Sequence, residues 1–119
     1  MSYEAQAVVI SGYSVPRDIW HEAFEYCDQH WKTDPSIPVD WEDYFIDMNP
    51  MTGNGETFFG EIIYRVDEYA PCKEFDTILA TASTIMRVQN AFDSIFTNFY
   101  MIKGYPLPKY NKYLGVRII

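Results

Sequence analysis

The spacing of hydrophobic and polar positions changes several times along the chain, and each change predicts a different element. Residues 4–13 (EAQAVVISGY) contain a β-branched run that predicts a strand ending near Gly12. Residues 16–32 repeat apolar side chains every three or four positions, which predicts an amphipathic helix of about four turns. The segment 33–39 contains two prolines and is predicted to be a loop.

Two stretches that alternate with a period of two come next. In residues 41–48, Tyr44, Ile46 and Met48 alternate with acidic positions, and residues 57–67 alternate in the same way. Between them, residues 49–55 (NPMTGNG) carry Asn-Pro and Asn-Gly signals that reverse a chain. The pattern predicts a hairpin with one buried face and one wet face.

Residues 74–102 return to a helical period, although the Thr and Ser residues between positions 77 and 84 lower the intrinsic helix propensity. Residues 95–102 fit either a continuation of that helix or a strand. After a turn rich in proline, residues 113–119 predict a closing strand.

The resulting order, β-α-β-β-α-β over residues 1–119, predicts one α+β domain. Its most economical arrangement is a ferredoxin-like sandwich, in which two helices cover one face of a four-stranded antiparallel sheet. This fold hosts many unrelated activities, so function has to be argued from particular residues.

The distribution of charge divides the chain into two unequal parts. The net charge is −8, but all 17 Asp and Glu lie in residues 1–102, which carry −12, whereas the last 17 residues carry +4. An acidic body argues against direct binding to nucleic acid, which requires clustered cations, and favours a protein partner with a basic surface.

Neither a long apolar run nor a basic leader is present, which predicts a protein with no membrane association. The two cysteines, Cys27 and Cys72, form no disulfide framework. These features together predict a cytoplasmic location.

The carboxylates of the predicted hairpin are the first candidates for chemistry. Asp43, Asp47 and Glu61 would share one face, where their oxygens could hold Mg²⁺ or act as an acid–base pair. A solvated sheet face explains the same pattern, and we expect no catalytic residue, metal or cofactor there. The turn at residues 51–57 (MTGNGET) lacks the lysine and the spacing of a phosphate-binding loop.

On the first predicted helix, His21, Glu25 and Asp28 face the same way and could bind a transition metal. A second histidine at the spacing of a zinc helix is missing, so a wet helix face is the preferred interpretation. Cys27 falls on the apolar face of this helix, and Cys72 is the more exposed thiol.

The acidic surface as a whole favours a different function. Carboxylates on the helix and on the following strand recur at separations of the same order as those between successive phosphates. Along each strand of DNA, phosphates follow one another about every 3.4 Å. We therefore expect a small non-enzymatic binding protein that inhibits a larger, basic, nucleic-acid-handling protein by mimicking nucleic acid. Compact size, high aromatic content and acidity are also features of small inhibitors encoded by viruses or mobile elements. Solubility alone is the competing explanation. The expected partner-binding residues are Glu22, Glu25, Asp28, Asp40, Glu42, Asp43, Asp47 and Glu61.

The basic, tyrosine-rich segment 103–119 is expected to dock on the acidic body or on a second copy, giving a homodimer. The alternative is a small-molecule or nucleotide-binding module with Tyr105, Tyr110 and Tyr113 lining the pocket. The residues assigned to docking or self-association are Tyr105, Lys109, Tyr110, Lys112, Tyr113 and Arg117.

Overall fold

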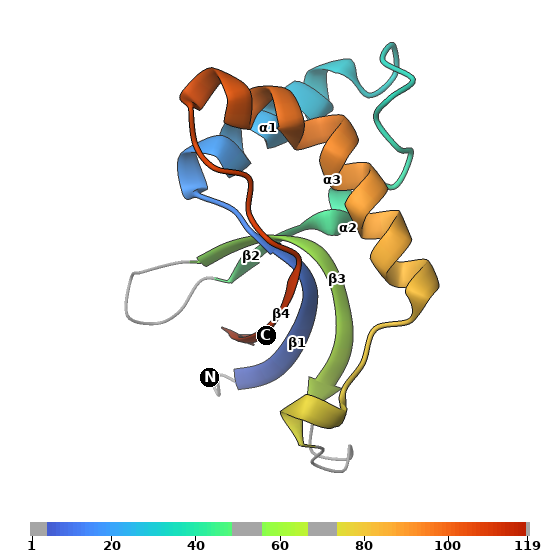
Figure 1. Ribbon diagram of the computed structural model, residues 1–119, viewed down its shortest axis with the longest axis vertical. Coiled ribbons are helices and arrows are strands. Elements are labelled where there is room, and N and C mark those ends of the chain that lie inside the picture. The colour runs from blue at the N-terminus through green and yellow to red at the C-terminus, as the bar shows by residue number, and fades with distance from the viewer. Residues whose placement is uncertain (1–4, 49–55, 67–73, 119) are drawn as a thin grey trace.

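The described residues form one antiparallel sheet with helices packed on one side of it (Figure 1). The computed structural model describes residues 5–48, 56–66 and 74–118. In sheet order, the strands are β2 (Phe45–Met48), β3 (Glu56–Val66), β1 (Ala5–Ser14) and β4 (Asn111–Ile118). The helices are α1 (Arg17–His30), α2 (Trp41–Tyr44) and α3 (Ala82–Lys103), with a 3-10 turn, η1 (Phe75–Thr77), before α3.

The α+β class and the four-stranded antiparallel sheet are confirmed. The exact ferredoxin-like β-α-β-β-α-β arrangement is not matched. Two elements that the pattern did not predict, α2 and η1, enter the order, and the sheet curls so that the side away from the helices is also packed.

Three predicted element boundaries were wrong. Residues 41–44 form the short helix α2 instead of the first half of a strand. Strand β1 continues through Gly12 to Ser14. Helix α3 begins at Ala82, eight residues after the predicted start, and then runs unbroken to Lys103, so residues 95–102 are helical. Strands β2 and β3 pair antiparallel, as in a hairpin, with Met48 opposite Glu56. The predicted turn of this hairpin, residues 49–55, lies outside the described residues.

Specific caps determine where α3 begins and ends. The Thr81 hydroxyl accepts a hydrogen bond from the Thr84 N–H at 3.1 Å, which satisfies one of the free donors of the first turn. At the other end Gly104 adopts φ 71°, a left-handed conformation that favours glycine, and its N–H donates to the Met101 carbonyl at 3.2 Å. Thr81, which seemed to weaken a longer helix, is therefore its start signal.

The larger core lies between the helices and the sheet, and we call it the helix-side core. Tyr13 of β1 stacks on Phe92 of α3 with ring centroids 3.9 Å apart, and Phe92 stacks on Phe96 at 4.9 Å. From β3, Phe59 meets Phe96 edge to face at 4.9 Å. The Trp20 ring N–H of α1 donates to the Phe58 carbonyl at 3.0 Å, so this large side chain is buried with its polar atom satisfied.

A second, smaller core occupies the opposite face of the sheet. It consists of strand residues alone: Val8, Ile10, Ile46, Met48 and Phe58. The sheet curls over this face, so that Met48 of β2 reaches the backbone of Gly115 in β4, where an added Cβ would lie 3.2 Å from the Met48 Cγ. The expectation of one buried and one wet hairpin face is therefore wrong, because Phe59 is buried on one side and its neighbour Phe58 on the other.

Gly12 and Gly60 face each other across the β1–β3 pair. Alternation along the strands places both on the curled side of the sheet, in line with Ile10 and Phe58. A Cβ built on Gly12 would lie 2.7 Å from the Gly60 Cα, and one built on Gly60 would lie 2.9 Å from the Gly12 Cα. The two strands approach each other this closely because neither residue has a side chain.

We expect Gly60→Ala to lower the free energy of unfolding by about 3 kcal/mol, since the added methyl group meets rigid backbone atoms. The matched control is Gly115→Ala, whose new methyl group would meet the flexible Met48 side chain and should cost about 1 kcal/mol or less. Urea denaturation followed by circular dichroism measures both. Equal stability of Gly60→Ala and the wild type would show that the close approach is not required.

One buried polar atom of the helix-side core has no hydrogen-bond partner in the part of the chain that the structure describes. This atom is the hydroxyl oxygen of Tyr100, a residue that is 3% exposed. Burial, followed by the negative charge of Asp18, raises the pKa of Tyr100 to about 12. The ring therefore stabilises the core while the hydroxyl destabilises it.

Tyr100→Phe is expected to raise the free energy of unfolding at pH 7 by about 1 kcal/mol, because it removes an unsatisfied buried group and keeps the ring. Between pH 10 and 12 the unfolded chain releases the Tyr100 proton before the folded protein does, so wild-type stability should fall as pH rises. The variant should lose that part of the decline. Thermal melts at pH 7, 9 and 11 test both statements, and a destabilised variant at pH 7 would contradict the first.

Candidate functional site

The eight acidic residues expected to bind a partner fall into two groups in the structure. Three of them form ion pairs within the molecule. Asp47 pairs with Arg17 at the start of α1 (3.1 Å), Glu61 pairs with Arg87 of α3 (3.0 Å), and Glu22 pairs with Lys103 at the end of α3 (3.2 Å). Such exposed pairs add little stability individually, but they orient each helix on the sheet or on its neighbour.

The expected convergence of Asp43, Asp47 and Glu61 does not occur. Asp43 belongs to α2, and the other two lie on the helix-facing side of the sheet, each bonded to an arginine of a different helix. The hydrogen bond to Glu61 is the main cause that raises the pKa of Arg87. Within residues 5–48, 56–66 and 74–118, no three His, Cys, Asp or Glu side chains are placed to hold a metal ion.

The second group contains the five remaining acids, all of which are exposed. None of them forms an ion pair with a base in the described ranges. Asp28 lies one turn beyond Phe24 on α1, and the Phe24 ring packs on Trp41 of α2 at 5.1 Å, so this contact joins the two helices on or beside which these acids lie. We call this group the acidic surface: Glu25, Asp28, Asp40, Glu42 and Asp43.

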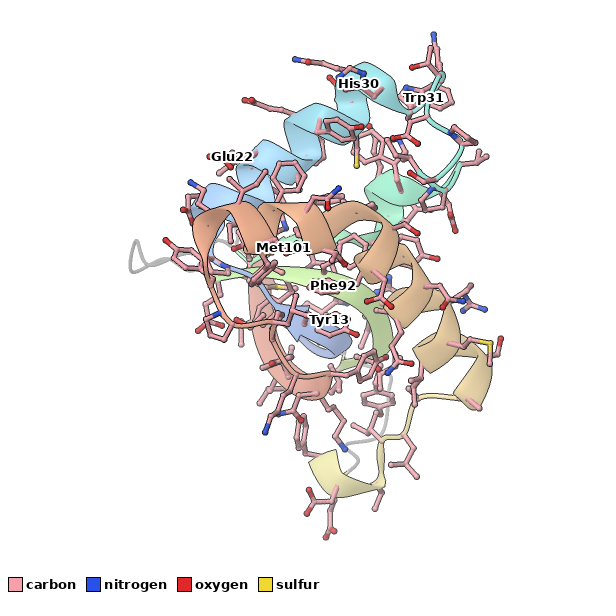
Figure 2. The ribbon with its side chains drawn as sticks, turned by 45° about the horizontal axis from the view of Figure 1, so that its top comes forward. Tyr13, Glu22, His30, Trp31, Phe92 and Met101 are labelled. Carbon is pink, nitrogen blue, oxygen red and sulfur yellow. The ribbon has the colours of Figure 1, made fainter. Side chains whose placement is uncertain are left out.

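A shallow hollow of about 290 Å³ lies in the acidic surface, lined by Trp31, Val39, Asp40, Trp41, Glu42 and Asp43. Figure 2 shows Trp31 at the end of α1, beside the loop that leads to α2. Val39 is 88% exposed and Trp31 39% exposed, so apolar and aromatic surface stands directly beside three carboxylates. The Lys32 ammonium lies 5.4 Å from the Trp31 ring centroid, a cation–π arrangement within the chain.

The loop between α1 and α2 is held by Asp34, a residue that the sequence patterns did not single out. Its carboxylate accepts hydrogen bonds from the Ser36 N–H (3.0 Å), the Ser36 hydroxyl (2.6 Å) and the Tyr26 hydroxyl (3.0 Å). These bonds, with Ser36 first, lower the pKa of Asp34. Ile37 anchors the same loop in the helix-side core. An Asp followed two residues later by Ser is the sequence signal for such a turn.

Two of the tyrosines assigned to the basic tail face the protein's own body. Tyr110 forms a hydrogen bond with the Ser11 hydroxyl and meets Tyr13 edge to face at 5.3 Å. Tyr113 packs on Phe58 at 5.1 Å. One hollow is lined by Tyr113 and another by Tyr110, and the exposed side chain of Tyr105 lines neither of them. Among the residues that the structure describes, the three tyrosines are therefore not gathered around one of these hollows.

The basic residues of the tail also differ from one another. The Lys112 ammonium donates to the carbonyls of Phe75 (2.6 Å) and Ile78 (2.9 Å) and lies 4.4 Å from the Phe75 ring centroid. Lys109 is exposed, and Arg117 pairs through its backbone with Gln6 of β1. Lys112 thus fastens β4 to η1.

Cys27 is buried, as its place on the apolar face of the predicted helix indicated, and the possible metal ligands of α1 lie apart from it. Cys27 is fully buried, and burial, followed by the charge of Asp34, raises the pKa of its thiol to about 12, which disfavours the reactive thiolate. The His21 ring meets Trp20 edge to face at 5.1 Å, while Glu25 and Asp28 belong to the acidic surface. Cys72 lies outside the described residues.

No protein-family model matches this sequence, and no curated protein or solved structure is detectably similar to it. In the part of the chain that the structure describes, no helix is long and apolar enough to cross a membrane. Functional inference therefore depends on the geometry above.

Lys112→Met should lower the free energy of unfolding by about 2 kcal/mol, because two carbonyls of the η1 turn lose a charged donor. Hydrogen exchange of residues 75–80 should also become faster. Lys109→Met, which removes an exposed lysine from the same segment, is the matched control and should change neither quantity. If both variants behave alike, Lys112 does not hold η1.

Proposed function

We propose that this protein is a non-enzymatic binding protein whose acidic surface inhibits a larger, basic, nucleic-acid-handling protein. The observation that carries the proposal is the hollow at α2, where Asp40, Glu42 and Asp43 surround exposed Trp31 and Val39. Carboxylates beside an aromatic ring suit arginine and lysine side chains, which combine charge with an apolar stem.

The local charge supports a basic partner. Residues 18–47 contain nine Asp or Glu and one Lys, so this segment alone carries a charge as large as that of the whole chain. Such a concentrated field attracts a positively charged surface and accelerates the encounter between the two proteins. The aromatic and aliphatic residues within it supply the apolar contact that electrostatic attraction alone lacks.

The arrangement of the charges supports mimicry of nucleic acid. Glu25 and Asp28 lie three residues apart on one helix, a spacing of about 5–6 Å between their Cβ atoms. The acids of α2 extend the charge beyond the Phe24–Trp41 contact. A group of exposed negative charges of this kind can occupy a channel that normally receives phosphates.

Charge reversal of three residues together, Asp40→Lys, Glu42→Lys and Asp43→Lys, is expected to weaken partner binding at least 100-fold, because the hollow would then repel a basic surface. The measurement begins with capture of host proteins on the immobilised wild type at low salt. The captured proteins are then challenged with duplex DNA, which should release a partner that the protein binds by mimicry. Affinity for the purified partner is compared between the wild type and the triple variant.

The control variant is Glu56→Lys, Asp76→Lys and Asp93→Lys, which reverses three exposed acids outside the acidic surface and adds the same charge. If this control weakens binding as much as the triple variant does, net charge alone governs the interaction and the site is wrong. If duplex DNA releases nothing, the mimicry is wrong even where the acidic surface is required.

A further inference from the structure

A second hollow lies between α1, α3 and the loop that leads out of α1, and it shares no lining residue with the hollow of the acidic surface. Its volume is about 340 Å³, at the lower end of the range of small-molecule sites, about 300–1,000 Å³. Figure 1 shows α1 and α3 packed together beside this loop. The lining includes Tyr26, Asp34, Asn98, Phe99 and Ile102.

The Asp34 carboxylate supplies a fixed negative charge to this hollow. Its Oδ1 accepts two hydrogen bonds from Ser36, whereas its Oδ2 accepts one bond in the described residues, from the Tyr26 hydroxyl at 3.0 Å. A carboxylate oxygen can accept about two bonds, so Oδ2 retains room for a further donor. Among the described bases, no lysine, arginine or histidine forms an ion pair with Asp34. Its charge is therefore available to a ligand.

The other walls of the hollow are mainly aromatic and aliphatic. The rings of Tyr26 and Phe99 have centroids 6.0 Å apart and meet at 76°. Aromatic rings attract a cation that comes within about 6 Å of a ring centroid, and a neighbouring carboxylate strengthens this preference. Ile95 and Ile102 add hydrocarbon to the same lining, and Ile102 is 82% exposed, so it can still bury surface against a ligand.

We propose that this hollow binds a small organic amine in its protonated form. The ammonium group donates to Oδ2 of Asp34, and the apolar body of the ligand lies against Phe99 and Ile102. The side-chain oxygen of Asn98, in the same lining, can accept a second N–H of the ammonium. The proposal uses none of the residues of the acidic surface and does not depend on the proposed function.

Charge and size together select this class of ligand. The Asp34 carboxylate repels an anion, and a neutral ligand gains no charge-assisted hydrogen bond from it. An apolar cavity of about 150 Å³ is large enough for benzene, so this hollow has room for an amine with a ring or a short branched chain. The ligand is therefore expected to combine one ammonium group with a compact apolar body.

Three probes of similar shape test the role of charge: phenethylamine, phenethyl alcohol and phenylacetate. Phenethylamine should bind the full chain with a dissociation constant of about 1 mM or below and shift the amide NMR signals of residues 26–36 and 94–102. Phenethyl alcohol should bind about 10-fold more weakly or worse, and phenylacetate should not bind. Equal affinity for the amine and the alcohol, or signal shifts confined to other residues, would overturn the proposal.

A fourth probe, n-butylamine, corresponds to the side chain of lysine. It lacks the apolar body and should bind about fivefold more weakly than phenethylamine. If the two amines bind equally well, the hollow accepts a lysine side chain of a protein as readily as a small molecule, and the assignment to a small molecule is wrong.

Two variants test the residues of the hollow. Asp34→Asn keeps an acceptor for Ser36 but removes the charge, and it should weaken phenethylamine binding about 10-fold. Ser94→Lys places a cation in the lining from an exposed helical position that tolerates lysine, and it should weaken binding at least as much. The matched control Asp93→Asn removes the same charge from the neighbouring residue, which does not line the hollow, and should change the affinity less than about twofold.

Thermal melts establish that each variant is folded before its affinity is compared. If Asp34→Asn does not fold, Ser94→Lys decides the outcome, because it leaves the hydrogen bonds of the loop in place. A folded Ser94→Lys protein that binds phenethylamine like the wild type would overturn the site. The same conclusion follows if Asp93→Asn weakens binding as much as Asp34→Asn does, because the general negative field of the protein would then explain the affinity.

Discussion

The close approach of β1 and β3 at Gly12 and Gly60 is the constraint on which the rest of the structure depends. These strands are central in the sheet, and β1 is buried on both faces, with Val9 at 1% and Ile10 at 0% exposure. On the curled side of the sheet, Phe58 and Met48 pack without any helix, and Met48 lies against Gly115 of β4. The helices can then all gather on the other side, around Tyr13 and Phe59.

Because all the helices pack on one face of the sheet, their placement determines which carboxylates form ion pairs and which remain without a basic partner. Helices that all pack on one side need fixed orientations there, and Arg17 and Arg87 provide them by pairing with Asp47 and Glu61 of the sheet. Those two carboxylates therefore belong to the fold. The acids of α2 and of the outer side of α1 form no such ion pair in the described residues. Asp34 holds the loop that connects these two helices. The separation into structural and available acids is a consequence of topology.

Local patterns predicted α1, the pairing of β2 with β3 and the α+β class, because each depends on periodicity within one segment. They failed at residues 41–44, where Trp41 and Tyr44 are both buried. A spacing of three over four residues fits a helical turn, while the acids between them resemble strand alternation. They also failed for the second core, since a strand buried on both faces shows no clean alternation.

The partners of the acids could not be predicted from the sequence either. Arg17 and Asp47 are 30 positions apart, and Glu61 and Arg87 are 26 apart, so only the folded sheet brings them together. Asp34 had a readable signal, the serine two residues later, but that signal predicts a turn and not what the turn presents. Net charge indicated an acidic protein correctly, whereas the choice of acids that face solvent without a base required three-dimensional placement.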